Sequence, residues 1–168
     1  MDLTISEKIL IIIKSFGIIG RELVKKSEIT DAYILLQDVF FDSIDKIDRI
    51  NPREIEIQIV DGTITMLKKI GLLEKNINGY ILTKKGDIFI TNKLSSSDSI
   101  NYLKASLEIA SLPEIQRHLF ALLVALKHDK ALKAQQKTAE HLEKSYQSLK
   151  NELKNKTLKS MLNGDSQA

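Results

Sequence analysis

The charged side chains are the strongest chemical signal in this sequence, because they are unevenly distributed. The chain of 168 residues has a net charge of +3. Residues 62–94 contain six Lys and two acidic residues, whereas residues 28–61 contain three basic and nine acidic residues. Residues 113–168 are basic again, with ten against six. Local excesses of Lys favour an anionic partner, because ammonium groups attract phosphates and carboxylates.

Patterns that would indicate catalysis or metal binding are weak. The sequence has no Cys, which excludes disulfides, thiol catalysis and cysteine-type zinc sites. It contains no phosphate-binding Gly-rich loop, no Gly-x-Ser-x-Gly elbow and no His-Glu-x-x-His motif. Three carboxylates at helical spacing, Asp38, Asp42 and Asp45, fit either a divalent cation or, more commonly, a solvated face. The histidines lack metal-ligand spacing to carboxylates: His118, His128 and His141. We therefore expect no enzyme, no metal and no cofactor.

The composition indicates a globular chain. Hydrophobic residues make up 43% and charged residues 28% of the sequence, enough apolar material for a core. The longest apolar run, residues 9–13, is far shorter than the roughly 20 residues that span a bilayer. We expect a cytoplasmic, nucleoid-associated protein without membrane insertion.

The basic and acidic segments fall on different predicted helices. Thr4 and Glu7 have capping-box spacing at the start of a first helix, which is predicted to stop at Gly17. A second helix is predicted over 31–48, with Thr30 as its N-cap. Its polar face contains Asp38 and three further Asp residues, so we expect this helix to present an acidic surface to solvent.

A third helix is predicted to begin at Asn51-Pro52 and to end at Gly71. Its apolar side consists of Val60, Ile64, Leu67 and Ile70. Gly62 interrupts the helix and is expected to mark a close packing contact or an approaching ligand, since Gly costs about 1 kcal/mol relative to Ala there.

Two short apolar segments then flank Asn78-Gly79, a pattern typical of a β-hairpin. Thr83 is predicted to cap a helix over 84–93, with Ile88 and Phe89 facing inward.

A serine-rich stretch, residues 95–99, is the predicted boundary between two domains. A helix is expected over 100–111, followed by a much longer one from Pro113. The apolar phase of this long helix slips between residues 126 and 132, so a bend or break is predicted near residues 128–130. The last residues, 163–168, are expected to be frayed.

Residues 60–89 resemble the winged helix-turn-helix family, including the regulators similar to MarR. The resemblance lies in Val60-x3-Ile64-x2-Leu67-x3-Gly71-Leu72-Leu73, followed by Gly79-Tyr80-Ile81-Leu82-Thr83-x2-Gly86. It is strong over about thirty residues and loose over 4–94. It implies a mainly α fold with a small hairpin wing: a winged helix-turn-helix domain over 1–94, and a helical, coiled-coil-like dimerisation region over 100–162.

The resemblance also implies double-stranded DNA binding and transcriptional regulation. The recognition helix would enter the major groove, and the basic wing would lie on the backbone. Glu54, Glu56 and Asp61 occupy the first half of that helix, so DNA would be approached mainly through 62–85. The DNA-binding residues implied are Arg53, Gln58, Thr65, Lys68, Lys69, Lys75, Asn76, Asn78, Lys84 and Lys85. The alternative is a winged helix that binds protein, as an adaptor in DNA segregation, replication or membrane remodelling.

The apolar seam of the C-terminal region predicts a homodimer. Two paired copies would present recognition helices to half-sites about 34 Å apart. The alternative is that the seam packs within its own chain. The residues predicted to pair are Leu119, Leu122, Leu126, Leu132, Ala139, Leu142, Tyr146, Leu149 and Leu153.

Overall fold

The computed structural model describes residues 2–41, 52–126 and 140–166, and side chains are described for 2–41, 54–125 and 140–157. Within these ranges the chain is mainly helical, with one antiparallel hairpin. The elements, in chain order, are α1 (Ile5–Ile18), α2 (Lys26–Phe41), α3 (Pro52–Lys69), β1 (Leu73–Asn76), β2 (Gly79–Leu82), α4 (Lys84–Lys93), α5 (Ser97–Ala110), α6 (Glu114–Leu126) and α7 (Glu140–Ser166).

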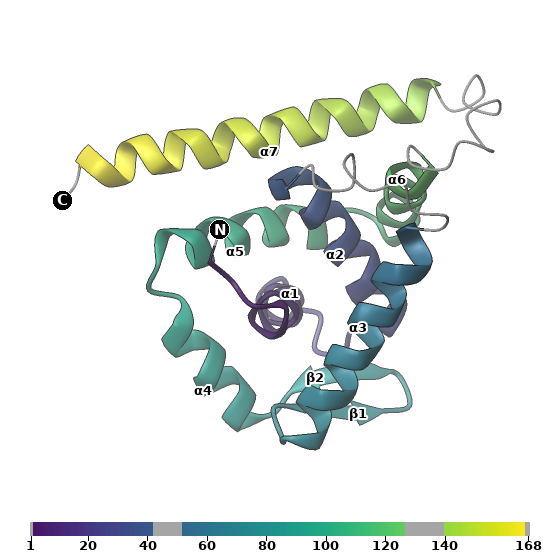
Figure 1. The fold of residues 1–168 in the computed structure, drawn as a ribbon, viewed down its shortest axis with the longest axis vertical. Coiled ribbons are helices and arrows are strands. Elements are labelled where there is room, and N and C mark those ends of the chain that lie inside the picture. Colours follow the sequence, from purple (N-terminus) through teal and green to yellow (C-terminus); the bar gives the residue numbers. More distant parts are fainter. Residues whose placement is uncertain (1, 42–51, 127–139, 167–168) are drawn as a thin grey trace.

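Helix α1 is the centre of the molecule, and α2, α3, α4 and α5 surround it (Figure 1). Its residues from Ile9 to Ile13 are all buried, because neighbours cover every side of the helix. The predicted capping box is confirmed: Glu7 N–H donates to Thr4 Oγ1 over 3.1 Å. The predicted stop at Gly17 is wrong by one residue, since α1 runs to Ile18 and the chain turns at Gly20, where φ is +98°.

Helix α2 differs from its prediction at the start and in its exposed face. It begins at Lys26, and Thr30 lies inside it, with Oγ1 donating to the Lys26 carbonyl. The prediction that Asp38 faces solvent is wrong, because this residue is only 5% exposed. Its carboxylate faces α7, where Tyr146 donates a hydrogen bond to it. The other predicted acidic positions, residues 42, 45 and 48, lie outside the described residues.

Helix α3 buries Val60, Ile64 and Leu67 as predicted, but Ile70 follows the helix end and is half exposed. The left-handed turn at Gly71, with φ of +84°, leads into β1. Gly62 is exposed, and a Cβ built on it would meet nothing within 4 Å. The first alternative predicted for Gly62, a close packing contact, is therefore wrong within the described residues, and the second, an approaching ligand, stays a prediction.

The predicted hairpin is confirmed, with Leu73 opposite Leu82 and Asn76 opposite Gly79. The two residues between the strands are therefore Ile77 and Asn78, and the glycine begins β2 instead of sitting in the loop. A side chain at Gly79 would come within 2.6 Å of the Val24 carbonyl oxygen, which explains why this position is glycine.

Thr83 caps α4 as predicted, with its Oγ1 accepting a hydrogen bond from Gly86 N–H. The predicted inward face of α4 is wrong, because Ile88 is 53% and Phe89 39% exposed. Gly86 and Ile90 are buried instead. A Cβ at Gly86 would lie 2.0 Å from the Leu72 carbonyl oxygen, so this close backbone contact decides which side of α4 faces the core.

The serine-rich stretch forms the turn between α4 and α5, where Ser96 caps α5 through Ser99 N–H. Helices on both sides of it share one hydrophobic core. Ser15 of α1 and Ser106 of α5 are buried and hydrogen-bonded over 2.7 Å. The predicted domain boundary therefore falls at the turn before α5 and at the first residues of α5, and the two-domain division stays a prediction.

The predicted long C-terminal helix is divided into α6 and α7, and the predicted break near residues 128–130 lies outside the described residues. Helix α7 continues to Ser166, past residue 163, where fraying was expected. It lies across α2, α5 and α6 (Figure 1). Across the ranges that the structure covers, we find no helix with the length and apolar character needed to cross a bilayer.

The apolar seam of α7 packs within its own chain. Tyr146 and Leu153 are buried, and Leu142 and Leu149 pack against the same core. In the single chain these side chains therefore already have partners, and their use between two copies stays a prediction. Leu119 of α6 stays exposed and Leu122 is half-buried. The remaining pairing residues, the side chain of Leu126 together with Leu132 and Ala139, lie outside the described residues.

Candidate nucleic-acid interface

The residues predicted to contact DNA come from α3, β1, the hairpin loop and α4. Every one of them whose side chain is described is exposed. Arg53 lies in the first turn of α3, and its side chain is not among those described. The exposed residues are Gln58, Thr65, Lys68, Lys69, Lys75, Asn76, Asn78, Lys84 and Lys85.

The end of α3 and the start of α4 are in direct contact. Thr83 Oγ1 donates a hydrogen bond to the Gly71 carbonyl over 2.6 Å, and Thr83 N–H donates to the Leu72 carbonyl over 3.1 Å. The hairpin lies between these two segments in the chain, so all three meet at one end of the molecule (Figure 1). We call the five lysines of this region, Lys68, Lys69, Lys75, Lys84 and Lys85, the basic end.

No carboxylate within the described ranges forms an ion pair with a lysine of the basic end. Two nearby acidic side chains have cationic partners elsewhere: Asp61 pairs with Lys26 at 3.2 Å and Asp87 with Lys14 at 2.7 Å. Glu56 is buried, which turns it away from this surface. Glu54 and Glu74 stay exposed. The basic end therefore keeps most of its positive charge available to an external anion.

Lys84 and Lys85 occupy the first turn of α4. Backbone dipoles make the N-terminal end of a helix positive, so two further cations there repel it. Free helix N–H groups and the dipole together favour an anion at such an end. Asp87 in the same turn offsets part of this repulsion, and a bound phosphate would offset the rest.

Few side chains of α3 are free to read base edges. Thr65 Oγ1 donates to the Asp61 carbonyl over 2.8 Å, which uses its only donor. Gly62 has no side chain to offer. Gln58, one turn earlier, is exposed and carries an amide that can both donate and accept. The interface consequently has many cations for phosphate and few groups for base recognition.

Sequence reasoning missed three apolar side chains near the basic end. Met66 and Ile70 are about half exposed, and Ile77 at the hairpin loop is fully exposed. Periodicity places Ile70 on the buried side of α3, and the hairpin pattern assigns no role to Ile77. The signal for the exposed Ile77 was its position in the sequence, as an isolated apolar residue between Asn76 and Asn78.

Sequence reasoning also missed a buried ionic cluster between α2 and α6. Arg117 Nη2 donates to Glu28 Oε2 over 2.6 Å, and both side chains are 1% exposed. Arg21 adds two hydrogen bonds to the Glu28 carboxylate, of 2.9 and 2.7 Å. Burial raises the pKa of Glu28, but the hydrogen bonds and charge of Arg21 and the charge of Arg117 outweigh it, so the net pKa is lowered.

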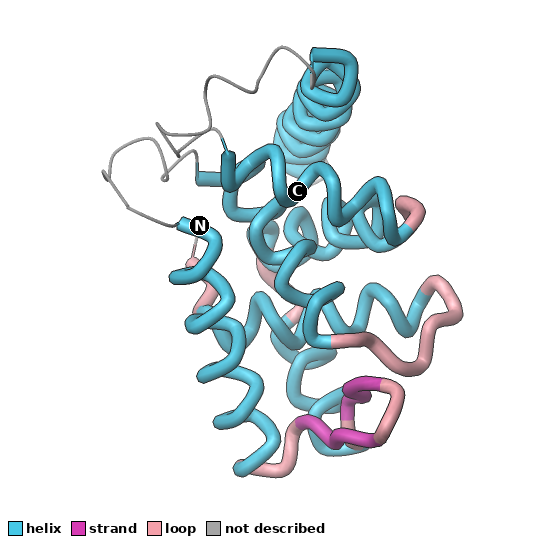
Figure 2. The backbone as a smooth tube through the Cα atoms, turned by 90° about the vertical axis from the view of Figure 1, so that its right-hand side faces the viewer, coloured by secondary structure: helices cyan, strands magenta, loops and turns pink. Residues whose placement is uncertain are grey.

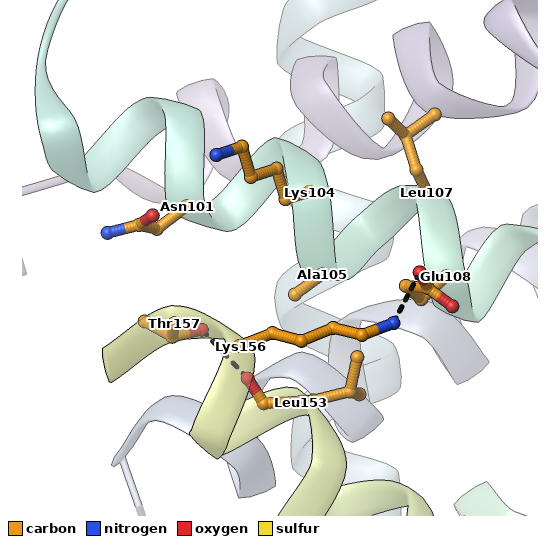
Figure 3. Close-up of a pocket in the computed structure, with 8 residues that line it drawn as sticks. All are labelled: Asn101, Lys104, Ala105, Leu107, Glu108, Leu153, Lys156 and Thr157. Atoms are coloured by element: carbon orange, nitrogen blue, oxygen red, sulfur yellow. Dashed lines mark hydrogen bonds and ion pairs between the residues drawn. The ribbon is translucent and has the colours of Figure 1, made fainter. Parts of the chain in front are cut away.

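A pocket of about 240 Å³ lies between α5 and α7, away from the basic end (Figure 3). Leu153 and Ala105 line its apolar part. Lys156 reaches across it to Glu108 at 3.0 Å. This ion pair and the apolar wall attach α7 to α5, so the residues of the pocket hold the two helices together.

Among the described residues no group of three or more His, Asp or Glu side chains is arranged to hold a metal ion. His118 Nδ1 lies 2.9 Å from Asp31 Oδ2, which is a pair and not such a group.

No protein-family model, curated protein or solved structure matches this chain.

Proposed function

We propose that this chain is a winged-helix protein that binds double-stranded DNA and regulates transcription. One observation carries the proposal: lysines from α3, β1 and α4 gather at one end of the molecule, with no paired carboxylate among the described residues. Phosphate groups neutralise such cations and release counterions, which supplies affinity without sequence recognition.

The order and pairing of the elements support the winged-helix part of the proposal. Three helices precede a two-stranded hairpin, as the resemblance implies. Val24, between α1 and α2, exchanges two backbone hydrogen bonds with Tyr80 of β2, of 3.0 and 2.8 Å. This bridge anchors the hairpin to the helical body, so the hairpin can serve as a wing of fixed position.

The charge along α3 sets how DNA would approach. Glu54 is exposed near the start of the helix and Asp61 is half-buried at its middle, whereas Lys68 and Lys69 end it. Carboxylates repel phosphates, so the C-terminal half of α3 enters the major groove. The hairpin and the start of α4 then contact the backbone on one side.

We expect Lys68→Glu combined with Lys69→Glu to weaken DNA binding by at least about 100-fold, because two phosphate contacts are lost and two repulsions are added. The measurement is fluorescence anisotropy of a labelled duplex at salt concentrations between about 50 and about 200 mM. Each lost phosphate contact lowers the slope of log affinity against log salt by about 0.9, so the slope should fall by about two.

The matched control is Lys144→Glu with Lys154→Glu on α7, which changes the net charge equally at the opposite side of the molecule (Figure 1). It should leave affinity within about threefold of the parent, since its lysines lie far from the basic end. Equal weakening by both double variants would mean that only net charge matters. A parent chain that binds no duplex at the lowest salt would contradict the proposed function.

Pairing of two copies is part of the proposal, and it now depends on α6. Ile115 is 76% exposed and Leu119 follows one turn later, also exposed. Helix α7 cannot contribute Tyr146 or Leu153, which are buried. We expect light scattering to give a dimer for the parent and a monomer for Leu119→Glu, because a buried charge at a helix pair is unfavourable. A dimer that persists in this variant would place the interface elsewhere.

A further inference from the structure

The tip of the hairpin presents one fully exposed isoleucine to solvent. Ile77 is the first of the two loop residues between β1 and β2. The hairpin lies at an extremity of the molecule (Figure 2). Lys75 precedes Ile77 by two residues, so an anionic partner drawn to the basic end would meet this apolar side chain.

Hydrogen bonds within the loop and at its base brace the tip. Asn76 Oδ1 accepts a hydrogen bond from Asn78 N–H over 2.8 Å, across Ile77. At the base of the loop, Gly79 packs against the Val24 backbone. Tyr80 is tied to Val24 by two backbone hydrogen bonds. The isoleucine therefore projects from a braced loop, so little conformational entropy is lost when it is inserted into a partner.

Few side chains around it are available for base edges, namely the Asn78 amide and the amide N–H groups of Asn76. The Thr65 hydroxyl donates within α3, and the Asn76 carbonyl oxygen is engaged within the loop. Lysines bind phosphates of any sequence. A DNA-binding surface of this composition can still discriminate between sequences through the energy needed to deform the duplex.

We infer that Ile77 is an apolar wedge that enters the minor groove and partly unstacks a base step, so that the protein selects DNA by its deformability. This inference rests on the DNA binding proposed above. Isoleucine is among the residues that proteins insert between base steps, and insertion kinks the duplex. Pyrimidine–purine steps unstack most easily, whereas A-tracts are stiff. The preferred DNA should therefore contain TA or CA steps.

The test compares two labelled duplexes of equal length and base composition, one with central TA steps and one with an A-tract. Anisotropy gives the affinity, and energy transfer between dyes at the two ends gives the bend. We expect the parent to bind the TA duplex about tenfold more tightly and to bend it. Ile77→Ser should lose both the preference and the bend while keeping the salt slope, because no charge changes. Ile77→Met should retain both properties.

Ile100→Ser replaces another exposed isoleucine, on α5, and should behave like the parent. If Ile77→Ser still bends the TA duplex and prefers it, the wedge is wrong while DNA binding stands. If the parent binds both duplexes equally, selection by deformability is wrong. If it binds neither duplex, the proposed function and the wedge both fail. Binding to phosphatidylserine vesicles instead of DNA would assign the tip to a membrane surface. It would overturn both the proposed DNA binding and the wedge.

Discussion

Replacing Glu28 by Gln should cost about 3–5 kcal/mol of unfolding free energy, the range for breaking a buried ion pair by removing one partner. The amide has nearly the shape of the carboxylate, but it removes the ion-pair partner of Arg117, which is 1% exposed, and leaves only the charges of Asp31 and Glu114 to offset it. Two backbone carbonyls, of Ala110 and Leu112, still accept hydrogen bonds from Arg117 and cannot replace the charge. Urea denaturation followed by circular dichroism measures the loss.

The control for Glu28 is Glu114→Gln, which removes one partner of an ion pair with Lys25 at 3.3 Å in which both side chains are more than half exposed. Exposed pairs contribute at most about 1 kcal/mol. Equal, small effects of Glu28→Gln and Glu114→Gln would mean that water reaches Arg117. A second variant, Glu28→Gln with Arg117→Met, should recover part of the loss, because it removes the orphaned charge.

The same pair predicts a direction for pH dependence. The folded-state pKa of Glu28 is lower than its ordinary value of 4.5. Its contribution to stability is therefore complete above the ordinary value and is lost as pH falls through the lower folded-state pKa. Glu28→Gln should show less of this acid-dependent loss than the parent.

A chain ending at residue 98 should fail to fold cooperatively. It lacks α5, α6 and α7, which contribute the buried side chains of Tyr102, Ile109, Phe120 and Val124 to the shared core. Each large buried side chain is worth about 1.5–3 kcal/mol, so their summed loss is comparable to a total stability of about 5–15 kcal/mol. Thermal unfolding by circular dichroism and binding of an apolar dye report the outcome.

A chain ending at residue 126 is the comparison for this truncation. It keeps α5 and α6 and loses only α7, hence Tyr146, Leu153 and the hydrogen bond to Asp38. We expect it to unfold cooperatively at a lower temperature than the parent. A sharp thermal transition of the 1–98 chain, like that of the parent, would mean that these residues fold as an independent domain. It would contradict the single shared core.

Several local features were predictable because neighbouring residues determine them. Thr4 and Thr83 cap helices through their own hydroxyls, as their positions before Glu7 and Gly86 indicated. Val60, Ile64 and Leu67 follow the helical period and are buried together. The hairpin follows from two short apolar segments around Asn and Gly. The positions of the lysines were equally visible in the sequence.

Errors arose wherever a distant segment decides the environment. The spacing of the Asp residues indicated a solvated face for α2, yet Tyr146 of α7 donates a hydrogen bond to Asp38 and buries it. Gly86 and Ile90 are the residues of α4 that face the core, because the α4 backbone packs on Leu72. No pattern of neighbouring residues indicates that contact.

The sequence by itself determined most of the helices, the hairpin and where positive charge accumulates, because these depend on side chains a few positions apart. Only the tertiary structure decided which acids are buried, that Thr83 bonds to Gly71 and so joins the lysines of α3 and α4, and that the α7 seam packs within its own chain. The physical reason is that an apolar stripe or a buried charge requires a complementary surface, and local sequence does not specify which segment, or which copy of the chain, provides it.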